Sequence, residues 1–314
     1  MMEIFTVKIC IIIQKIYRNY MEVIMNKSFW LITTEQLKGK LWFKDEEDYK
    51  VGMNYVAILS STSPVSVLAF ILMSNHVHFV VEGSYSEVSV FIGRFKSLYS
   101  QYSSHKYSDK ELLRNNSVDI RPVSLTDESL LRAIAYVQMN SVAANICIQA
   151  SGYPWGTGDA FFRVSPSAGK PLGSYRVLRC RKMLHSKISL PKDYIVDNRG
   201  FVLPESYVQV KFVESVFRTP KRMMAFLLNS SKIKSHPDKN PKFSDMLLLS
   251  TLRELCQSAF GVKDFSNLDY NQKADALRIL RYRFFSDSKQ ISRVTGLDIE
   301  VVDKLLDSFY LQDR

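Results

Sequence analysis

The stretch Phe70-Ile71-Leu72-Met73-Ser74-Asn75-His76-Val77-His78-Phe79-Val80-Val81 decides the fold of this chain. Two apolar runs meet at Ser74-Asn75, a pair typical of tight turns, and this pattern predicts two neighbouring strands. Side chains on a strand alternate between its faces, so His76 and His78 point to the same side. Two imidazoles on one face supply two ligands of a metal site, and a third ligand has to come from elsewhere. A pair of surface histidines at a strand end is the alternative interpretation.

The segments around this hairpin predict the rest of the sheet. Residues 29–34 are rich in aromatic and β-branched residues and predict a first strand, and residues 45–60 predict a helix with an acidic first turn. Ser86 is the expected N-cap of a helix over 87–107, and residues 116–123 predict a further short strand. This order predicts an α+β fold, a ferredoxin-like antiparallel sheet with helices on one face, followed by a mostly α-helical C-terminal region.

A third predicted helix follows Thr126-Asp127-Glu128, its expected cap, and runs to about residue 146. Tyr136 and Asn140 are four residues apart in this helix, so they share a face. The alanines around them leave open space beside the phenol and the amide. A buried tyrosine with a satisfied hydroxyl is the alternative interpretation of this helix.

Three segments in this order resemble the single-tyrosine HUH transposases, in particular the REP-associated tyrosine transposases of insertion-sequence type. They are the hairpin quoted above, Ala135-Tyr136-Val137-Gln138-Met139-Asn140-Ser141-Val142-Ala143-Ala144-Asn145, and Tyr153-Pro154-Trp155-Gly156. The resemblance covers residues 29–162, and Ser141 stands where the family usually has proline. It implies that His76 and His78 bind a divalent metal, Mg²⁺ or Mn²⁺, that Tyr136 is the nucleophile, and that Asn140 is the third ligand or a close support.

The resemblance also implies an activity. It predicts a DNA transposase or single-strand DNA endonuclease that cleaves and rejoins DNA through a 5′-phosphotyrosine, on single-stranded DNA with palindromic hairpins. One tyrosine per chain handles one strand end at a time, so a homodimer is a candidate assembly. Two alternatives stay open: a catalytically silent, domesticated DNA-binding protein of the same fold, and a replication or mobilisation nuclease that uses the same site.

The charge distribution independently indicates nucleic acid. The formal net charge is +11, and residues 163–240 carry sixteen Lys/Arg against five Asp/Glu, so this block accounts for the whole excess. A basic block attracts polyanions, although a solvated surface that aids solubility is the alternative. The candidate phosphate contacts are Arg94, Lys96, Arg176, Arg179, Arg181, Lys182, Arg218, Lys221 and Arg222.

Composition predicts four segments: a dispensable or disordered extension over 1–24, an HUH tyrosine transposase domain over 25–162, a basic linker or middle region over 163–240, and a helical, helix-turn-helix-like domain over 241–314. The four cysteines are scattered without Cys-x-x-Cys spacing, which favours a reducing compartment, here the bacterial cytoplasm and its nucleoid. No run has the length needed to span a bilayer.

The C-terminal segment pairs two short predicted helices around Gly296 and is similar to the C-terminal DNA-binding domain of the bacterial replication initiator. The presumed recognition helix is acidic, the wrong sign for a DNA groove: Asp298, Glu300, Asp303 and Asp307 stand against Lys304. Other basic residues are therefore candidate DNA contacts here, unless the unit only packs against the basic middle: Arg278, Arg281, Arg283, Lys289 and Arg293.

Overall fold

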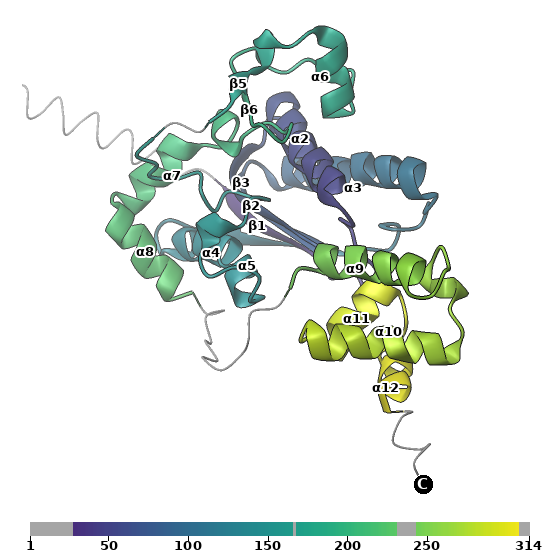
Figure 1. Cartoon of the computed structure of the whole chain (residues 1–314). Coiled ribbons are helices and arrows are strands. Elements are labelled where there is room, and N and C mark those ends of the chain that lie inside the picture. The colour runs from purple at the N-terminus through teal and green to yellow at the C-terminus, as the bar shows by residue number, and fades with distance from the viewer. Residues whose placement is uncertain (1–27, 166–167, 231–242, 308–314) are drawn as a thin grey trace, which may run out of the picture.

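The structure is a computed structural model that describes residues 28–165, 168–230 and 243–307. The extension predicted over 1–24 lies outside the described residues, and so do residues 166–167 and 231–240 of the predicted basic middle region. A four-stranded antiparallel sheet with the strand order β2-β3-β1-β4 forms the centre of the molecule (Figure 1). Its strands are β1 (Phe29–Thr34), β2 (Ser66–Met73), β3 (His76–Glu82) and β4 (Val118–Val123). The predicted α+β class and its antiparallel sheet are confirmed.

Helices cover both faces of this sheet, whereas the sequence predicted helices on one face only. The helices α2 (Glu46–Thr62) and α3 (Tyr85–Tyr107) cover the first face, where Phe79 packs against Phe91 and Phe95 of α3. The neighbouring residue His78 contacts Tyr136 of α4 (Ser129–Gln138). Since neighbouring side chains on a strand point to opposite faces, α4 lies on the second face.

The strands β1, β2 and β3 span the residues that the sequence indicates, whereas β4 begins two residues later than predicted. Two helix boundaries also differ from the prediction. The helix α3 is capped by Ser84, not Ser86, because Ser84 and Glu87 form a reciprocal capping box. The third predicted helix ends earlier than expected, because α4 stops at Gln138 and a short α5 (Asn140–Ala143) follows.

The middle of the chain packs onto the sheet. Core residues Leu172, Phe201 and Phe217 belong to the same buried hydrophobic cluster as the strands, so this core extends past the boundary predicted at residue 162. A β5–β6 pair and three helices make up this part: β5 (Lys170–Pro171), α6 (Val177–Leu184), β6 (Ile195–Val196), α7 (Val210–Phe217) and α8 (Pro220–Leu228).

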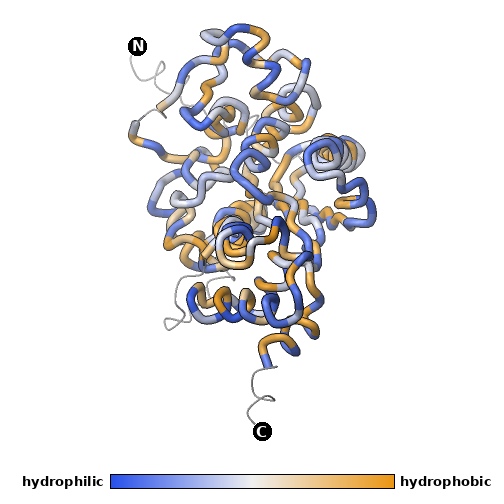
Figure 2. The backbone as a smooth tube through the Cα atoms, turned by 45° about the vertical axis from the view of Figure 1, so that its right-hand side comes forward, coloured by the Kyte–Doolittle hydropathy of each residue, from blue (hydrophilic) through white to orange (hydrophobic). Residues whose placement is uncertain are grey.

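The C-terminal helices enclose a second hydrophobic core, centred on Leu248, Leu277 and Ile291. Hydrophobic and hydrophilic residues alternate along these helices (Figure 2), as expected for helices that bury one side. Gly296 ends α11 in the left-handed conformation, φ 76°, which favours glycine. No helix in the described part of the chain is long and apolar enough to cross a membrane. The helices are α9 (Asp245–Ser258), α10 (Tyr270–Arg283), α11 (Ser288–Thr295) and α12 (Ile299–Asp307).

A buried carboxylate ties α2 to α3. Asp48 is fully buried and accepts hydrogen bonds from the hydroxyls of Tyr102 (2.9 Å) and Tyr107 (2.8 Å) and from the backbone N–H of Lys44 (2.7 Å). The ammonium of Lys106 lies 2.7 Å from the same carboxylate and neutralises it. Burial, together with this neighbouring carboxylate, raises the pKa of both tyrosine hydroxyls, which keeps them protonated as donors.

We expect Lys106→Met to lower the free energy of unfolding by about 2 kcal/mol, because it removes the ammonium that is paired with the buried Asp48 carboxylate at 2.7 Å. This loss in the free energy of unfolding is smaller than the loss expected for a fully buried ion pair, since the Lys106 side chain is 27% exposed. Urea unfolding followed by circular dichroism measures it. The exposed Lys110→Met is the control, and equal stability of the two variants would contradict a structural role for this ion pair.

Candidate metal and tyrosine site

The strand β3 places the rings of His76 and His78 side by side, and the ring of His78 contacts Tyr136 of α4. The ring centroids of His76 and His78 are 4.8 Å apart, and those of His78 and Tyr136 are 5.4 Å apart, edge to face in both pairs. His78 is 1% exposed and His76 6% exposed, while Tyr136 is partly exposed. Three of the four predicted site residues therefore form one row of rings across the second face of the sheet.

Side-chain oxygens hold the Nδ1 atoms of both imidazoles. The Asn75 amide donates to the carbonyl of Leu37 (3.3 Å), which directs its Oδ1 toward His76 Nδ1 at 2.8 Å. Because a carbonyl oxygen only accepts, His76 Nδ1 carries the proton, and in the neutral ring Nε2 has the lone pair that a metal requires. Thr33 Oγ1 lies 3.0 Å from His78 Nδ1 and is compatible with the same tautomer.

Asn140 stands at the junction of α4 and α5. Its Nδ2 donates to the backbone carbonyl of Tyr136 at 2.7 Å, a local bond of the kind that competes with continued helix. This contact directs the amide nitrogen of Asn140 toward the end of α4, so the amide oxygen points away from the Tyr136 carbonyl. Asn140 and His76 line the same pocket, of about 340 Å³, together with Gln36, Met73, Ala143 and Ala144. The structure thus places the fourth predicted residue beside the first histidine.

The residues present fit a divalent metal by the chemistry of their donors. Among the described residues, no group of three or more His, Cys, Asp or Glu side chains is placed to hold an ion. A site at this position therefore needs a third ligand of another type, and the Asn140 amide oxygen is of such a type. Two imidazole nitrogens and one amide oxygen suit Mn²⁺ and are compatible with Mg²⁺ when water completes the shell.

Tyr136 also borders a second pocket, of about 360 Å³, between α4 and α8. Arg132 lines this pocket one helical turn before Tyr136, and Phe226 and Asn229 of α8 form its other wall. Arg222 of α8 donates to Glu128 at 2.8 Å, which joins the two helices at the edge of the pocket. The ring of Tyr136 thus contacts His78 on one side and borders a pocket that is lined by one basic residue, Arg132, and one acidic residue, Glu128.

The predicted DNA contacts divide between the two sides of the molecule. One group lies on the side of Tyr136, because α8 packs against α4 and Arg218 stands just before α8, at the end of α7: Arg218, Lys221 and Arg222. Those on α6 lie behind the other face, because α6 packs against α2: Arg176, Arg179, Arg181 and Lys182. Arg94 and Lys96 belong to α3 on that same far face.

The sequence indicated Arg94 and Lys96 as outward-facing charges of their helix, and the structure differs from this at Lys96. Its ammonium donates to the backbone carbonyl of Asn116, and burial lowers its pKa. It therefore links α3 to the segment before β4 and is not presented to solvent as a phosphate contact. Arg94 is exposed, as predicted.

Sequence reasoning missed four neighbours of the site. Arg132 had a usable signal, since it stands four residues before Tyr136 on the same helix face. Asn75 was visible only as a turn residue, and its contact with the ring of His76 required coordinates. Thr33 and Gln36 gave no signal, because their proximity depends on the pairing of β1 with β3 and on the loop after β1.

Comparisons with known proteins give one structural similarity. A solved structure of a REP-associated tyrosine transposase bound to a REP hairpin aligns with 41% of this chain and 76% of its own length. The sequence identity is 16% and the TM-score is 0.31. No protein-family model matches the chain, and no curated protein matches it.

Proposed function

We propose that this chain is a DNA transposase or single-strand DNA endonuclease that cleaves and rejoins DNA through a 5′-phosphotyrosine on Tyr136. One observation carries the proposal: the ring of Tyr136 lies against His78, which lies against His76, on one face of a rigid sheet. The three residues come from two elements that are separated by some sixty residues in sequence, and the fold joins them. The transposase-like sequence motifs named above contain the same residues.

Tyr136 suits nucleophilic attack on a phosphodiester. Its oxygen forms a bond to phosphorus, the bond to the 3′ oxygen breaks, and a free 3′-hydroxyl leaves. The phenol gives up a proton and the 3′ oxygen gains one, so charge and atoms balance. One phosphodiester replaces another, and the reverse attack by a 3′-hydroxyl rejoins the strand without ATP. A divalent ion held by His76, His78 and Asn140 would offset the negative charge that develops on the phosphate.

The position of Tyr136 favours a single strand as substrate. Its partly exposed side chain lies at a pocket walled by α4 and α8, beside a sheet face that is largely covered by helices. A flexible single strand can bring one phosphate to such a position, whereas a duplex presents its phosphates on a stiff, wide surface. Arg132 of α4 lines this pocket, and Arg218 at the end of α7 and Lys221 of α8 add positive charge on the same side of the sheet.

A covalent adduct tests the proposal directly. The full chain is incubated with a single-stranded hairpin DNA that is labelled at its 5′ end or at its 3′ end, with and without Mn²⁺, and is then run on a denaturing gel. The expected result is a metal-dependent adduct that retains the 3′ label and releases the 5′ label, since the tyrosine holds the 5′ phosphate. An adduct with the opposite label would contradict the 5′-phosphotyrosine, because the tyrosine would then hold a 3′ phosphate. No adduct at all would favour a catalytically silent DNA-binding protein.

Basic residues on α8 and α6 should contribute unequally to DNA binding. We expect the pair Arg218→Gln and Lys221→Gln to reduce the slope of log affinity against log salt concentration by about 1.4, because each lost contact with single-stranded DNA contributes about 0.7. The pair Arg179→Gln and Arg181→Gln on α6 is the matched control and should leave the slope unchanged. Fluorescence anisotropy at several salt concentrations measures both, and equal slopes would show that the α8 side is not preferred.

A further inference from the structure

A buried carboxylate joins the C-terminal helices to the turn that carries His76. Asp245, the first residue of α9, is 5% exposed. Within the helical unit it accepts from Gln290 Nε2 (2.9 Å) and from Arg293 Nε (2.9 Å) and Nη2 (3.2 Å). Across the interface it accepts from the hydroxyl of Ser74 at 2.7 Å. Ser74 is the first residue of the β2–β3 turn, two positions before His76.

The turn transmits this contact to the imidazole through a short chain of hydrogen bonds. The Ser74 carbonyl accepts from the backbone N–H groups of Trp42 (2.8 Å) and Phe43 (3.2 Å), which fixes the turn on the loop before α2. The next residue, Asn75, exchanges two hydrogen bonds with Leu37 and uses its Oδ1 to hold His76 Nδ1. A shift of Ser74 therefore moves the side chain that sets the tautomer and direction of His76.

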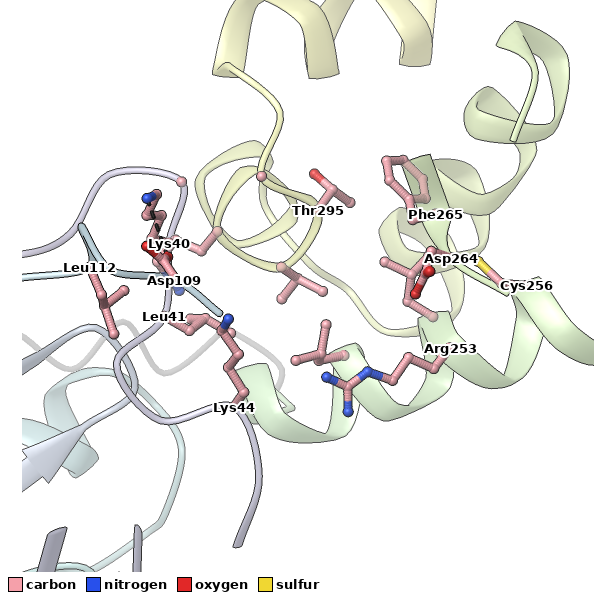
Figure 3. Close-up of a pocket in the computed structure, with 16 residues that line it drawn as sticks. Lys40, Leu41, Lys44, Asp109, Leu112, Arg253, Cys256, Asp264, Phe265 and Thr295 are labelled. Atoms are coloured by element: carbon pink, nitrogen blue, oxygen red, sulfur yellow. Dashed lines mark hydrogen bonds and ion pairs between the residues drawn. The ribbon is translucent and has the colours of Figure 1, made fainter. Parts of the chain in front are cut away.

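Elsewhere in the interface Met246 of α9 packs against the first core, and two pockets interrupt the contact between the units. A pocket of about 420 Å³ separates the loop around Lys44 from α9 and α11, and Figure 3 shows Lys44 and Arg253 on its opposite walls. A second pocket, of about 690 Å³, lies between residues 35–39 and the start of α12. Two cations across a pocket do not attract one another, so Lys44 and Arg253 do not hold the units together. The second pocket is lined by charged side chains of both signs. Charge-assisted hydrogen bonds to a buried carboxylate are strong, and this makes Asp245 a major element of docking.

We propose that Asp245 is a positioning residue for His76, and that the C-terminal helical unit, docked through Ser74, preorganises the candidate metal site. Docking of the helices and metal binding at the histidines then favour one another, since such coupling is reciprocal. The metal part of this inference rests on the proposed function, whereas the ordering of the turn does not. The C-terminal helical unit thereby fixes the turn before His76, in addition to any contact that it makes with DNA.

Ser74→Ala in the full chain tests whether the bond to Asp245 orders the turn. It is the smallest suitable change, because it removes the hydroxyl and leaves Asp245 paired with Arg293. We expect about tenfold faster amide hydrogen exchange at Trp42 and Phe43. We also expect an Mn²⁺ dissociation constant that is raised about tenfold, which is the smallest loss of affinity usual when a residue that supports a metal ligand is changed. Ser288→Ala is the matched control, since it removes a 2.6 Å hydrogen bond to Asp303 inside the helical unit. Ser74→Thr should restore both values, as Ser74 borders a pocket of about 290 Å³ that has room for a methyl group.

Asp245→Ala tests the same link from the other side, because it removes the carboxylate that accepts from Ser74. Ser74→Ala and Asp245→Ala should be non-additive for exchange at Trp42 and Phe43 when combined, because each removes the same contact. Unchanged exchange in both single variants overturns the inference, and so does faster exchange with wild-type affinity for Mn²⁺. If the unaltered protein binds no Mn²⁺, the metal-dependent function fails, and the exchange measurement still decides whether Asp245 orders the turn.

Discussion

Tyr136→Phe is expected to abolish covalent adduct formation and DNA cleavage, a loss of at least about 1,000-fold, and to leave DNA affinity within about threefold of the unaltered protein. The substitution removes one oxygen, and the ring that contacts His78 at 5.4 Å stays in place. Without the phenol oxygen no phosphotyrosine can form, whereas the basic side chains that attract DNA are unchanged. A denaturing gel measures the adduct, and fluorescence anisotropy measures binding.

The matched control for this experiment is Tyr85→Phe. Tyr85 is 58% exposed and begins α3, which covers the opposite face of the sheet. Loss of its hydroxyl should leave cleavage and binding unchanged. Cleavage by the Tyr136→Phe variant at the rate of the unaltered protein would remove Tyr136 from the mechanism. Equal loss in both variants would point to a general effect on folding.

The sheet was predictable because its signals are local. Each strand has its own run of apolar and β-branched residues, and the observed bounds of β1, β2 and β3 are those that the runs predict. The paired faces of His76 and His78 follow from the period of the strand alone. The relation of Tyr136 to Asn140 follows from the helical turn, even though the helix is interrupted at Met139.

Features that depend on pairing between distant segments were not predictable. The apolar residues on one side of α4 show that this helix is partly buried. They do not indicate which face of the sheet it covers, and for this reason the prediction of helices on one face was wrong for α4. The charge of a residue does not indicate which side of the molecule it occupies. Arg181 lies on α6, which packs against α2, whereas Lys221 lies on α8, which packs against the helix of Tyr136. The capping error at Ser84 arose from two serines that are two positions apart, of which the structure uses the first.

The contact between Asp245 and Ser74 joins residues 171 positions apart, and no sequence pattern marks either of them. Ser74 reads as a turn residue and Asp245 as an acidic first residue of a helix, and both descriptions are correct. Their meeting depends on how the second core packs beside the first. The sequence thus predicts the candidate reacting groups of the site. It does not predict the contacts between distant segments that position those groups.

The last prediction concerns the metal. His78→Ala is expected to weaken Mn²⁺ binding by about 100-fold or more, because it removes one of two imidazoles from a site whose third donor is an amide oxygen, a weaker ligand. His78 is 1% exposed, so the substitution also leaves a cavity, and the thermal unfolding of the variant without metal has to be recorded beside it. Electron paramagnetic resonance of free Mn²⁺ during a titration gives the dissociation constant.

Thr33→Val separates metal binding from packing. Valine has nearly the shape of threonine but lacks the hydroxyl that lies 3.0 Å from His78 Nδ1, so the ring stays and its orienting partner is lost. We expect about tenfold weaker Mn²⁺ binding, as for other partners of metal-bound histidines. Thr62→Val is the matched control, because that hydroxyl donates to the Ile58 carbonyl in α2, behind the other face of the sheet. Wild-type affinity in both His78→Ala and Thr33→Val would mean that the metal, if one binds, does not bind at these histidines.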